Sequence, residues 1–197
     1  VEAINKATEL LSNAKFPVIL SGAGVVLANA IEDFVKLAEK LDAPVACGYQ
    51  HNDSFPGKHP LAVGPLGYNG SKAAMEIISK ADVVLALGTR LNPFSTLPGY
   101  GIDYWPKEAN IIQVDINADR IGLTKKVSVG ICGDATLVAQ QILSKLDSKA
   151  GDIDREDRKS LIHQTKSAWL QTLTSLDHEE DDEGTTWNKD SRERDPD

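Results

Sequence analysis

The sequence is short of cysteine and has no long apolar run. Only two cysteines occur among its 197 residues, Cys47 and Cys132, and each ends a short apolar segment. We expect both to be reduced, buried thiols, as is usual in a cytoplasmic protein, with a disulfide or redox pair as the alternative. The longest apolar runs, such as residues 81–88, are far too short to cross a bilayer, and no secretory signal peptide is visible. We therefore expect a cytoplasmic location and no membrane partner.

Positive charge is scarce as well. Residues 1–146 carry 13 Lys and Arg against 14 Asp and Glu, whereas residues 147–197 carry 8 against 15. The net charge of −8 therefore belongs mainly to the C-terminal segment, and no basic patch indicates a nucleic-acid partner. A hydrophobic content of 41% and a charged content of 25% are typical of a soluble globular domain with its own core. Because the first residue is Val1, we expect a processed or excised piece of a longer protein.

Short apolar segments alternate with amphipathic ones along most of the chain. Strands are expected at residues 16–21, 43–47, 82–88, 110–115 and 127–132. Helices are expected at residues 2–12, 27–41 and 72–80, in a short turn at 118–126 and after Asp134. Near-continuous apolar strands are typical of parallel sheets that are covered on both faces. This order predicts an α/β fold with three layers, a mostly parallel sheet of five to six strands and right-handed crossovers.

Two long loops and a distinct C-terminal segment interrupt this pattern. The loops span residues 47–75 and 89–107, and loops of this length are usually functional or disordered. The regular units around residues 47–75 favour function. Beyond residue 148, an apolar stripe over residues 154–176 predicts one long helix. We expect it to dock on a partner outside this chain, with docking on its own domain as the alternative. Residues 178–197 are rich in acid and predict a mobile linker or tail, in which Trp187 is available to insert into a neighbouring domain.

Glycines follow the first predicted strand, at the edge where ligands bind in open α/β sheets. Gly22 and Gly24 permit a tight turn, and the helix that follows offers N–H groups to an anion. The dinucleotide fingerprint would place a third glycine where Leu27 stands. Binding of a phosphate or an adenine nucleotide and a tight turn without a ligand both stay open.

Charged side chains follow the later strands. Arg90 comes after a buried strand, where its planar guanidinium suits a phosphate or carboxylate, and a structural ion pair is the alternative. Asp115 ends the fourth strand and either takes ribose hydroxyls or caps the next turn. Asp134 is above all a helix N-cap, with an adenine contact as the alternative.

A self-sufficient active site is not visible in the sequence. His51 and His59 have no Cys, Asp or Glu at zinc-like spacing, so we expect no metal site. There is no nucleophile elbow, no complete P-loop and no carboxylate pair with clear acid–base geometry. We therefore assign no catalytic residue within this chain.

Taken in order, the motifs resemble the central domain of thiamine-diphosphate-dependent enzymes of the acetolactate synthase and oxalyl-CoA decarboxylase type. They are Ser-Gly-Ala-Gly at 21–24, His-Pro-Leu at 59–61, Gly-x-x-Gly-Ser-Lys-Ala-Ala at 67–74, Ala-Asp-x-x-Leu-Ala-Leu-Gly-x-Arg at 81–90, Ile-Ile-Gln-Val-Asp at 111–115 and Gly-Asp-Ala at 133–135. Each motif alone is weak, whereas the ordered set over residues 1–146 is strong. The resemblance implies a Rossmann-like domain of the DHS-like NAD/FAD-binding type.

A closer resemblance is to the sulfoacetaldehyde acetyltransferase family. It is carried by His-Asn-Asp-Ser-Phe-Pro at 51–56, Gly-Pro-Leu-Gly-Tyr at 64–68, Pro-Phe at 93–94, Thr-Leu-Pro at 96–98, Asp-Tyr-Trp-Pro at 103–106 and Ser-Val-Gly-Ile-Cys-Gly-Asp at 128–134. This family cleaves sulfoacetaldehyde with phosphate to acetyl phosphate and sulfite, in taurine metabolism, using thiamine diphosphate and Mg²⁺. In acetolactate synthases an acidic and a basic residue stand near positions 93–94, and both are absent here.

The resemblance also implies what the fragment lacks. The Glu that activates the thiamine ring lies in a preceding domain, and a Gly-Asp-Gly motif for diphosphate and Mg²⁺ lies in a following one. No Gly-Asp-Gly occurs in this chain, so the fragment alone is not expected to bind thiamine diphosphate productively or to be active. The implied organisation is a central domain over residues 1–147 and a helix plus acidic linker over residues 148–197.

Relatives hold FAD, ADP or a CoA moiety in the central domain. By position, the implied ligand contacts are Gly22, Gly24, Gly70, Arg90, Asp115 and Asp134. Residues His51, Tyr68 and Phe94 are implied to line a substrate channel. A homodimer or homotetramer is expected. The alternatives are a stand-alone or vestigial nucleotide-binding module of another thiamine-diphosphate enzyme and a scaffold that mainly joins two catalytic domains.

Overall fold

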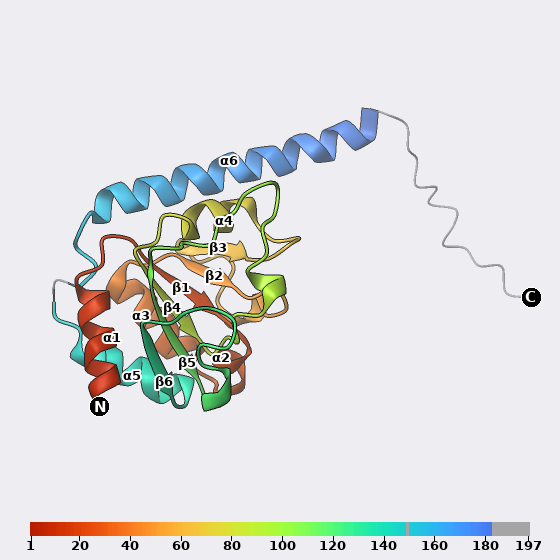
Figure 1. The fold of residues 1–197 in the computed structure, drawn as a ribbon. Helices are drawn as coiled ribbons and strands as arrows, with labels where there is room; N and C mark the ends of the chain where they lie inside the picture. The colour runs from red at the N-terminus through yellow and green to blue at the C-terminus, as the bar shows by residue number, and fades with distance from the viewer. Residues whose placement is uncertain (149, 183–197) are drawn as a thin grey trace, which may run out of the picture.

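The computed structural model of the chain describes residues 1–148 and 150–182. Six strands form one parallel sheet in the order β3-β2-β1-β4-β5-β6 (Figure 1). The strands are β1 (Pro17–Ser21), β2 (Val45–Cys47), β3 (Ala62–Pro65), β4 (Val83–Leu87), β5 (Asn110–Asp115) and β6 (Val129–Cys132). Strands β1 and β4 are buried along their whole length, as expected for central strands covered on both faces.

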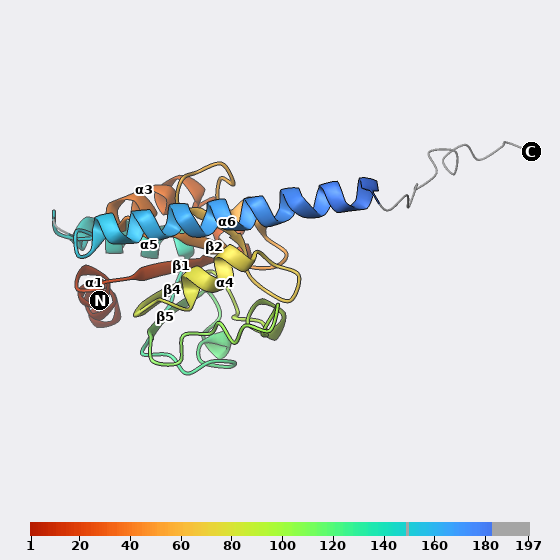
Figure 2. The same ribbon diagram turned by 90° about the horizontal axis from the view of Figure 1, so that it is seen from above.

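Helices cover both faces of this sheet. They are α1 (Glu2–Ser12), α2 (Ala23–Leu27), α3 (Ile31–Leu41), α4 (Lys72–Ile78), α5 (Ala135–Lys145) and α6 (Arg155–Asp182). Helices α3 and α5 pack together on one face with α1 beside them, and α4 lies on the other face, next to α6 (Figure 2). The predicted three-layer α/β fold is confirmed, and all strand pairs are parallel.

Strand β1 lies at the centre of the strand order. Ile19 stands opposite Val45 of β2 on one side and opposite Leu85 of β4 on the other. The chain runs outward from β1 to β3, crosses back and continues from β4 to β6. The strand order therefore reverses between β1 and β4, which is the place where ligands bind in doubly wound sheets.

The loop expected over residues 47–75 contains the edge strand β3. This strand has only four residues, includes Gly64 at φ +97° and ends in Pro65. Its register with β2 shifts between Val45 and Ala46. A proline without an N–H is tolerated at a sheet edge, and so short a segment has no clear period. Ser71 then caps α4, as its side chain accepts a hydrogen bond from the Ala74 N–H at 3.2 Å.

The prediction of a single helix over residues 27–41 is wrong at the start of that range. The chain forms a separate short helix α2 and then turns through Asn29, which has φ +53°. Leu27 closes α2 and is 85% exposed, so it does not belong to the core face. Helix α3 begins only at Ile31 and buries Phe34 on its inner side.

The two cysteines are free thiols in different surroundings. Cys47 is buried, as expected, whereas Cys132 is exposed. Strand β6 alternates buried and exposed residues because it is the second edge of the sheet and is covered on one side. The expectation of burial is therefore wrong for Cys132.

Helix α6 confirms the long helix expected over residues 154–176, but its docking differs from the expectation. Arg158 and Ile162 are buried against the chain's own domain. The Lys166 ammonium donates to the Pro60 carbonyl at 2.9 Å. The expected docking on an outside partner is therefore wrong for the first half of the helix. Farther along, exposed apolar side chains follow: Leu170, Leu173 and Leu176.

The acidic tail with Trp187 lies outside the described residues, apart from the end of α6. No helix within residues 1–148 and 150–182 is long and apolar enough to cross a membrane.

Candidate functional site

A cavity of about 580 Å³ opens where β1, β4 and β5 end. This volume is in the usual range for small-molecule sites. Its lining comes from the segments after these strands and after β6. The predicted site residues among them are Gly22, Gly24, His51, Arg90, Phe94, Asp115 and Asp134. The fold therefore brings together seven of the nine residues singled out from the sequence.

Three glycines allow the turns after β1 and β4 to touch. The Gly24 N–H donates to the Gly88 carbonyl at 2.9 Å, and the Gly22 N–H donates to the Leu87 carbonyl at 3.2 Å. A Cβ atom on Gly24 would lie 2.6 Å from the Gly88 Cα. Gly88 itself has φ +62°. Close packing of the two turns explains why glycine stands at these positions. The N–H groups of Gly22 and Gly24 already donate hydrogen bonds within the protein.

Two arginines supply positive charge at the cavity. Arg90 is exposed, and no carboxylate of the described residues lies within ion-pair distance of it, so the alternative of a structural ion pair finds no support in this part of the chain. The second is Arg120, at the end of the 3₁₀ turn η3 (Ala118–Arg120). Sequence reasoning missed Arg120, although the rule that singled out Arg90 applies equally to the turn after β5.

The two aspartates each use one oxygen in a local cap. Oδ1 of Asp115 accepts a hydrogen bond from the Asn117 N–H at 2.9 Å. Oδ1 of Asp134 accepts from the N–H groups of Thr136 at 2.9 Å and Leu137 at 3.1 Å, which confirms the predicted N-cap of α5. Within the described chain, the second oxygen of each carboxylate has no hydrogen-bond donor. Both remain available to hydroxyl or amino groups of a ligand.

Gly70 and Tyr68 are not among the residues that line the cavity. Gly70 is buried in the turn before α4, where a Cβ atom would lie 2.5 Å from the Pro65 carbonyl oxygen. The side chain of Tyr68 is 65% exposed, and its N–H donates to the Phe94 carbonyl at 3.3 Å. Phe94, also exposed, reaches the cavity from the same junction.

Cys47 lies just before the cavity-lining Gly48. Burial raises the pKa of the Cys47 thiol, against smaller lowering effects of hydrogen bonds from Ser54 and Ser21. Because the thiolate is the nucleophilic form, a thiol with a raised pKa is unsuited to covalent catalysis at neutral pH.

The donor groups present decide which ligands fit. Two arginines and two aspartates that line one cavity suit the phosphates and the ribose or adenine of a nucleotide. Thiamine diphosphate and its metal do not fit this chain alone. The described residues contain no group of three or more His, Cys, Asp or Glu side chains that could hold a metal ion, and the sequence has no Gly-Asp-Gly.

Comparison with known proteins identifies the family to which this domain is similar. Residues 4–142 match the family described as thiamine pyrophosphate enzyme, central domain. The chain is 76% identical to a probable sulfoacetaldehyde acetyltransferase of Rhizobium meliloti (strain 1021) over 195 residues, 99% of this chain and 33% of that protein. It is 71% identical to a sulfoacetaldehyde acetyltransferase of Roseovarius nubinhibens (strain ATCC BAA-591 / DSM 15170 / ISM) over 196 residues, 100% of this chain and 32% of that protein.

A third relative is more distant. The chain is 34% identical to a probable acetolactate synthase large subunit of Methanococcus aeolicus over 173 residues, 88% of this chain and 28% of that protein. The chain spans about a third of the length of the two acetyltransferases. The family match covers β1 to β6 and the whole candidate site. The chain thus belongs to the thiamine pyrophosphate enzymes, of which it forms the central domain.

Proposed function

We propose that this domain is part of a sulfoacetaldehyde acetyltransferase. The observation that carries the proposal is the degree of similarity, because five relatives with that name are 52–76% identical to the chain, whereas three acetolactate synthases are 34–38% identical. The similarity to the Rhizobium meliloti protein also extends over nearly the whole chain, including the C-terminal segment beyond the family match. The absence of the acidic and basic residues near Pro93 and Phe94 supports the same choice.

The proposed reaction of the full-length protein converts sulfoacetaldehyde and phosphate to acetyl phosphate and sulfite. The carbon–sulfur bond breaks and sulfite leaves with its electron pair. The aldehyde carbon loses its proton, the methylene carbon gains a proton and becomes the methyl group, and a phosphate oxygen forms the new bond to the former aldehyde carbon. Thiamine diphosphate, held with Mg²⁺ by the flanking domains, supplies carbanion-stabilising chemistry. We place this reaction in taurine metabolism in the cytoplasm, in a homodimer or homotetramer.

This domain contributes a scaffold and a nucleotide site in the proposal. Arg90 would hold phosphates, while the free oxygens of Asp115 and Asp134 would accept hydrogen bonds from ribose or adenine. ADP, FAD and CoA share these groups. His51 and Phe94 stand on the same cavity, where they would form a wall toward the substrate channel. The reaction needs no redox flavin, so the nucleotide would be structural or regulatory.

Parallel substrate assays test the proposal. The full-length polypeptide is incubated with thiamine diphosphate, Mg²⁺ and either sulfoacetaldehyde with phosphate, pyruvate or oxalyl-CoA. The expected result is turnover of sulfoacetaldehyde alone. Efficient condensation of pyruvate, or decarboxylation of oxalyl-CoA, would overturn the substrate assignment.

A further inference from the structure

A second groove, of about 990 Å³, lies between helix α6 and the side of the domain that carries β3 and α4 (Figure 1). This volume is at the upper end of the range for small-molecule sites. No described residue lines both this groove and the cavity at the carboxyl ends of the strands. The two are therefore separate places on the molecule.

The lining of this groove is mainly apolar. Leu61, Val63 and Ala73 contribute to it from the domain and are buried. Leu170 and Leu173 contribute from α6, where they are 64% and 41% exposed. A hydrocarbon group in the groove would remove these two leucines from water, which favours binding through the hydrophobic effect.

The two carboxylates that line the groove already have partners. Oε1 of Glu39 lies 3.2 Å from Nε2 of His59. The Asp42 carboxylate lies 4.0 Å from the buried guanidinium of Arg158 and 3.9 Å from the ammonium of Lys159. The groove therefore offers no free carboxylate to a cationic ligand within the described chain.

Lys166 brings a positive charge to the middle of this lining. Its ammonium donates to the Pro60 carbonyl at 2.9 Å, and no carboxylate of the described residues lies within ion-pair distance of it. Since an ammonium carries three N–H donors, two remain for a ligand. Burial lowers the pKa of Lys166, because desolvation disfavours its charged form. A carboxylate bound beside the ammonium would offset this desolvation.

We propose that the groove binds a small apolar monocarboxylate, such as a medium-chain fatty acid, with its carboxylate on the Lys166 ammonium and its hydrocarbon part beside Val63 and Leu170. An anionic head and an apolar body are the two features that complement this lining. The inference goes beyond the proposed function and does not rest on it, because the groove and the nucleotide site share no described residue.

Calorimetry on the full-length protein with thiamine diphosphate and Mg²⁺ tests the site, with decanoate, octanoate and decanol as probes. Octanoate should bind about tenfold more weakly than decanoate, because two fewer methylene groups are buried. Lys166→Gln should weaken decanoate binding about tenfold, the usual loss for a hydrogen bond to a charged group, and change decanol binding less than about twofold. Lys166→Arg keeps the charge and should retain most of the decanoate affinity.

The matched control for the charge is Lys80→Gln. Lys80 is an exposed cation just after α4 and does not line the groove. This substitution should leave decanoate binding unchanged.

The apolar wall has its own pair of variants on α6. Leu170→Asn should weaken the binding of decanoate and decanol alike, by severalfold, because both ligands cover this side chain. Leu176→Asn is the control, since Leu176 is exposed on the same helix and does not line the groove. Both positions are exposed, so neither substitution should disturb the fold.

Thiol labelling locates the ligand. Ser167 lines the groove and is half-buried. In a Cys132→Ala background, Ser167→Cys should react with a maleimide, whereas buried Cys47 should not. Decanoate should slow this reaction at concentrations that saturate the calorimetric signal. A Cys at this position that stays unreactive without ligand would show that another part of the polypeptide fills the groove, which would overturn the proposal.

The remaining outcomes decide the other parts of the proposal. Absence of decanoate binding, or labelling that bound decanoate does not slow, would overturn the site itself. Equal effects of Lys166→Gln and Lys80→Gln, or equal losses for decanoate and decanol in Lys166→Gln, would overturn the role of Lys166. Failure of the sulfoacetaldehyde assay would leave all of these results unaffected, so the two proposals fail separately.

Discussion

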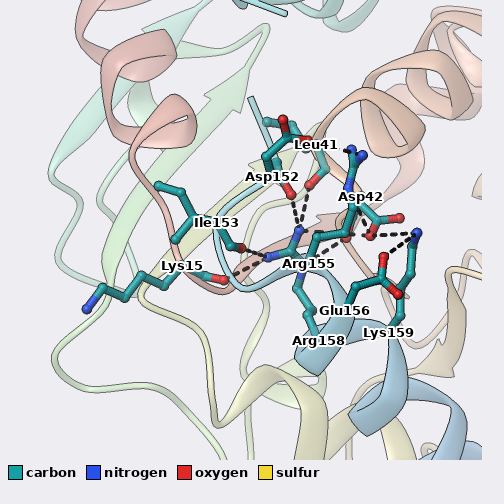
Figure 3. A network of polar contacts seen from close by, with 10 residues as sticks. Lys15, Leu41, Asp42, Asp152, Ile153, Arg155, Glu156, Arg158 and Lys159 are labelled. Carbon is teal, nitrogen blue, oxygen red and sulfur yellow. Dashed lines mark hydrogen bonds and ion pairs between the residues drawn. The ribbon is translucent and has the colours of Figure 1, made fainter. Parts of the chain in front are cut away.

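The buried guanidinium of Arg158 donates to the backbone carbonyl of Asp42 at 2.9 Å and lies 4.0 Å from the carboxylate of the same residue (Figure 3). Arg158 is 1% exposed. Its nitrogens also donate to four further carbonyls, which are those of Lys15, Leu41, Gly151 and Ile153. One side chain thus joins the start of α6 to the end of α3 and to the segment before β1.

Replacing Arg158 should destabilise the domain strongly. Arg158→Met keeps an apolar stem of similar length but leaves five carbonyls without the guanidinium donor. It also removes one of the cations that lie within 4.0 Å of the Asp42 carboxylate. We expect a loss of about 3 kcal/mol or more in the free energy of unfolding, measured by urea denaturation. The control is Arg155→Met. The Arg155 side chain is partly exposed, pairs with Asp152 at 3.1 Å and with the Asp42 carboxylate at 3.6 Å, and donates to none of the five carbonyls. This substitution should cost about 1 kcal/mol or less. Equal losses would show that the carbonyl contacts contribute little.

The contact between the turns after β1 and β4 leaves no room for a methyl group. Gly24→Ala should lower the free energy of unfolding by about 1–3 kcal/mol, because the new Cβ meets backbone atoms that cannot rotate away. Gly57→Ala is the control, since nothing lies within 4 Å of a Cβ there. Thermal melts of both variants check the prediction, and an unchanged melting temperature for Gly24→Ala would contradict the tight packing.

Tyr104 should make the domain sensitive to high pH. Burial raises the pKa of Tyr104 to about 12 from an ordinary value of 10. The unfolded chain therefore loses this proton first, so stability is complete below pH 10 and falls as the pH rises through 12. The expected loss is roughly 2–3 kcal/mol over that range, at about 1.4 kcal/mol per pKa unit.

Tyr104→Phe is the matched variant for this pH effect. It keeps the ring and removes the hydroxyl that donates to the Ser95 carbonyl at 3.3 Å. The variant should be about 1 kcal/mol less stable at neutral pH and should show a smaller decline at high pH than the parent. Identical pH profiles from chemical denaturation would rule out a buried, shifted Tyr104.

The thiols should react at different rates. Exposed Cys132 should be labelled quickly by a disulfide reagent in the folded protein, whereas buried Cys47 should react only after unfolding. Burial also raises the pKa of Cys47, which lowers its thiolate fraction. Cys132→Ala should abolish the fast phase. A remaining fast phase in that variant would mean that Cys47 is accessible.

Local signals in the sequence predicted two features of the candidate site. Asp134 before an apolar helix indicated an N-cap, and its carboxylate caps α5. Arg90 after an apolar strand indicated a place at the carboxyl edge of the sheet, and it lines the cavity there. Each of these inferences needed only a few neighbouring residues.

Features that depend on distant partners could not be predicted in this way. Arg158 bonds to the Lys15 carbonyl, 143 positions away, and a backbone carbonyl leaves no mark in the sequence. The docking of α6 on its own domain was for that reason only the alternative to docking on an outside partner. Strand β3 was missed because it is short, contains Gly64 and ends in Pro65, so that only pairing with β2 defines it.

The products that the full-length protein forms from sulfoacetaldehyde are the direct test of whether it is a sulfoacetaldehyde acetyltransferase. Sulfite and acetyl phosphate are measured together, with and without phosphate, in the presence of thiamine diphosphate and Mg²⁺. We expect one acetyl phosphate for each sulfite and no sulfite release when phosphate is left out. Sulfite release that does not depend on phosphate, or the absence of sulfite alongside acetolactate formation from pyruvate, would contradict it.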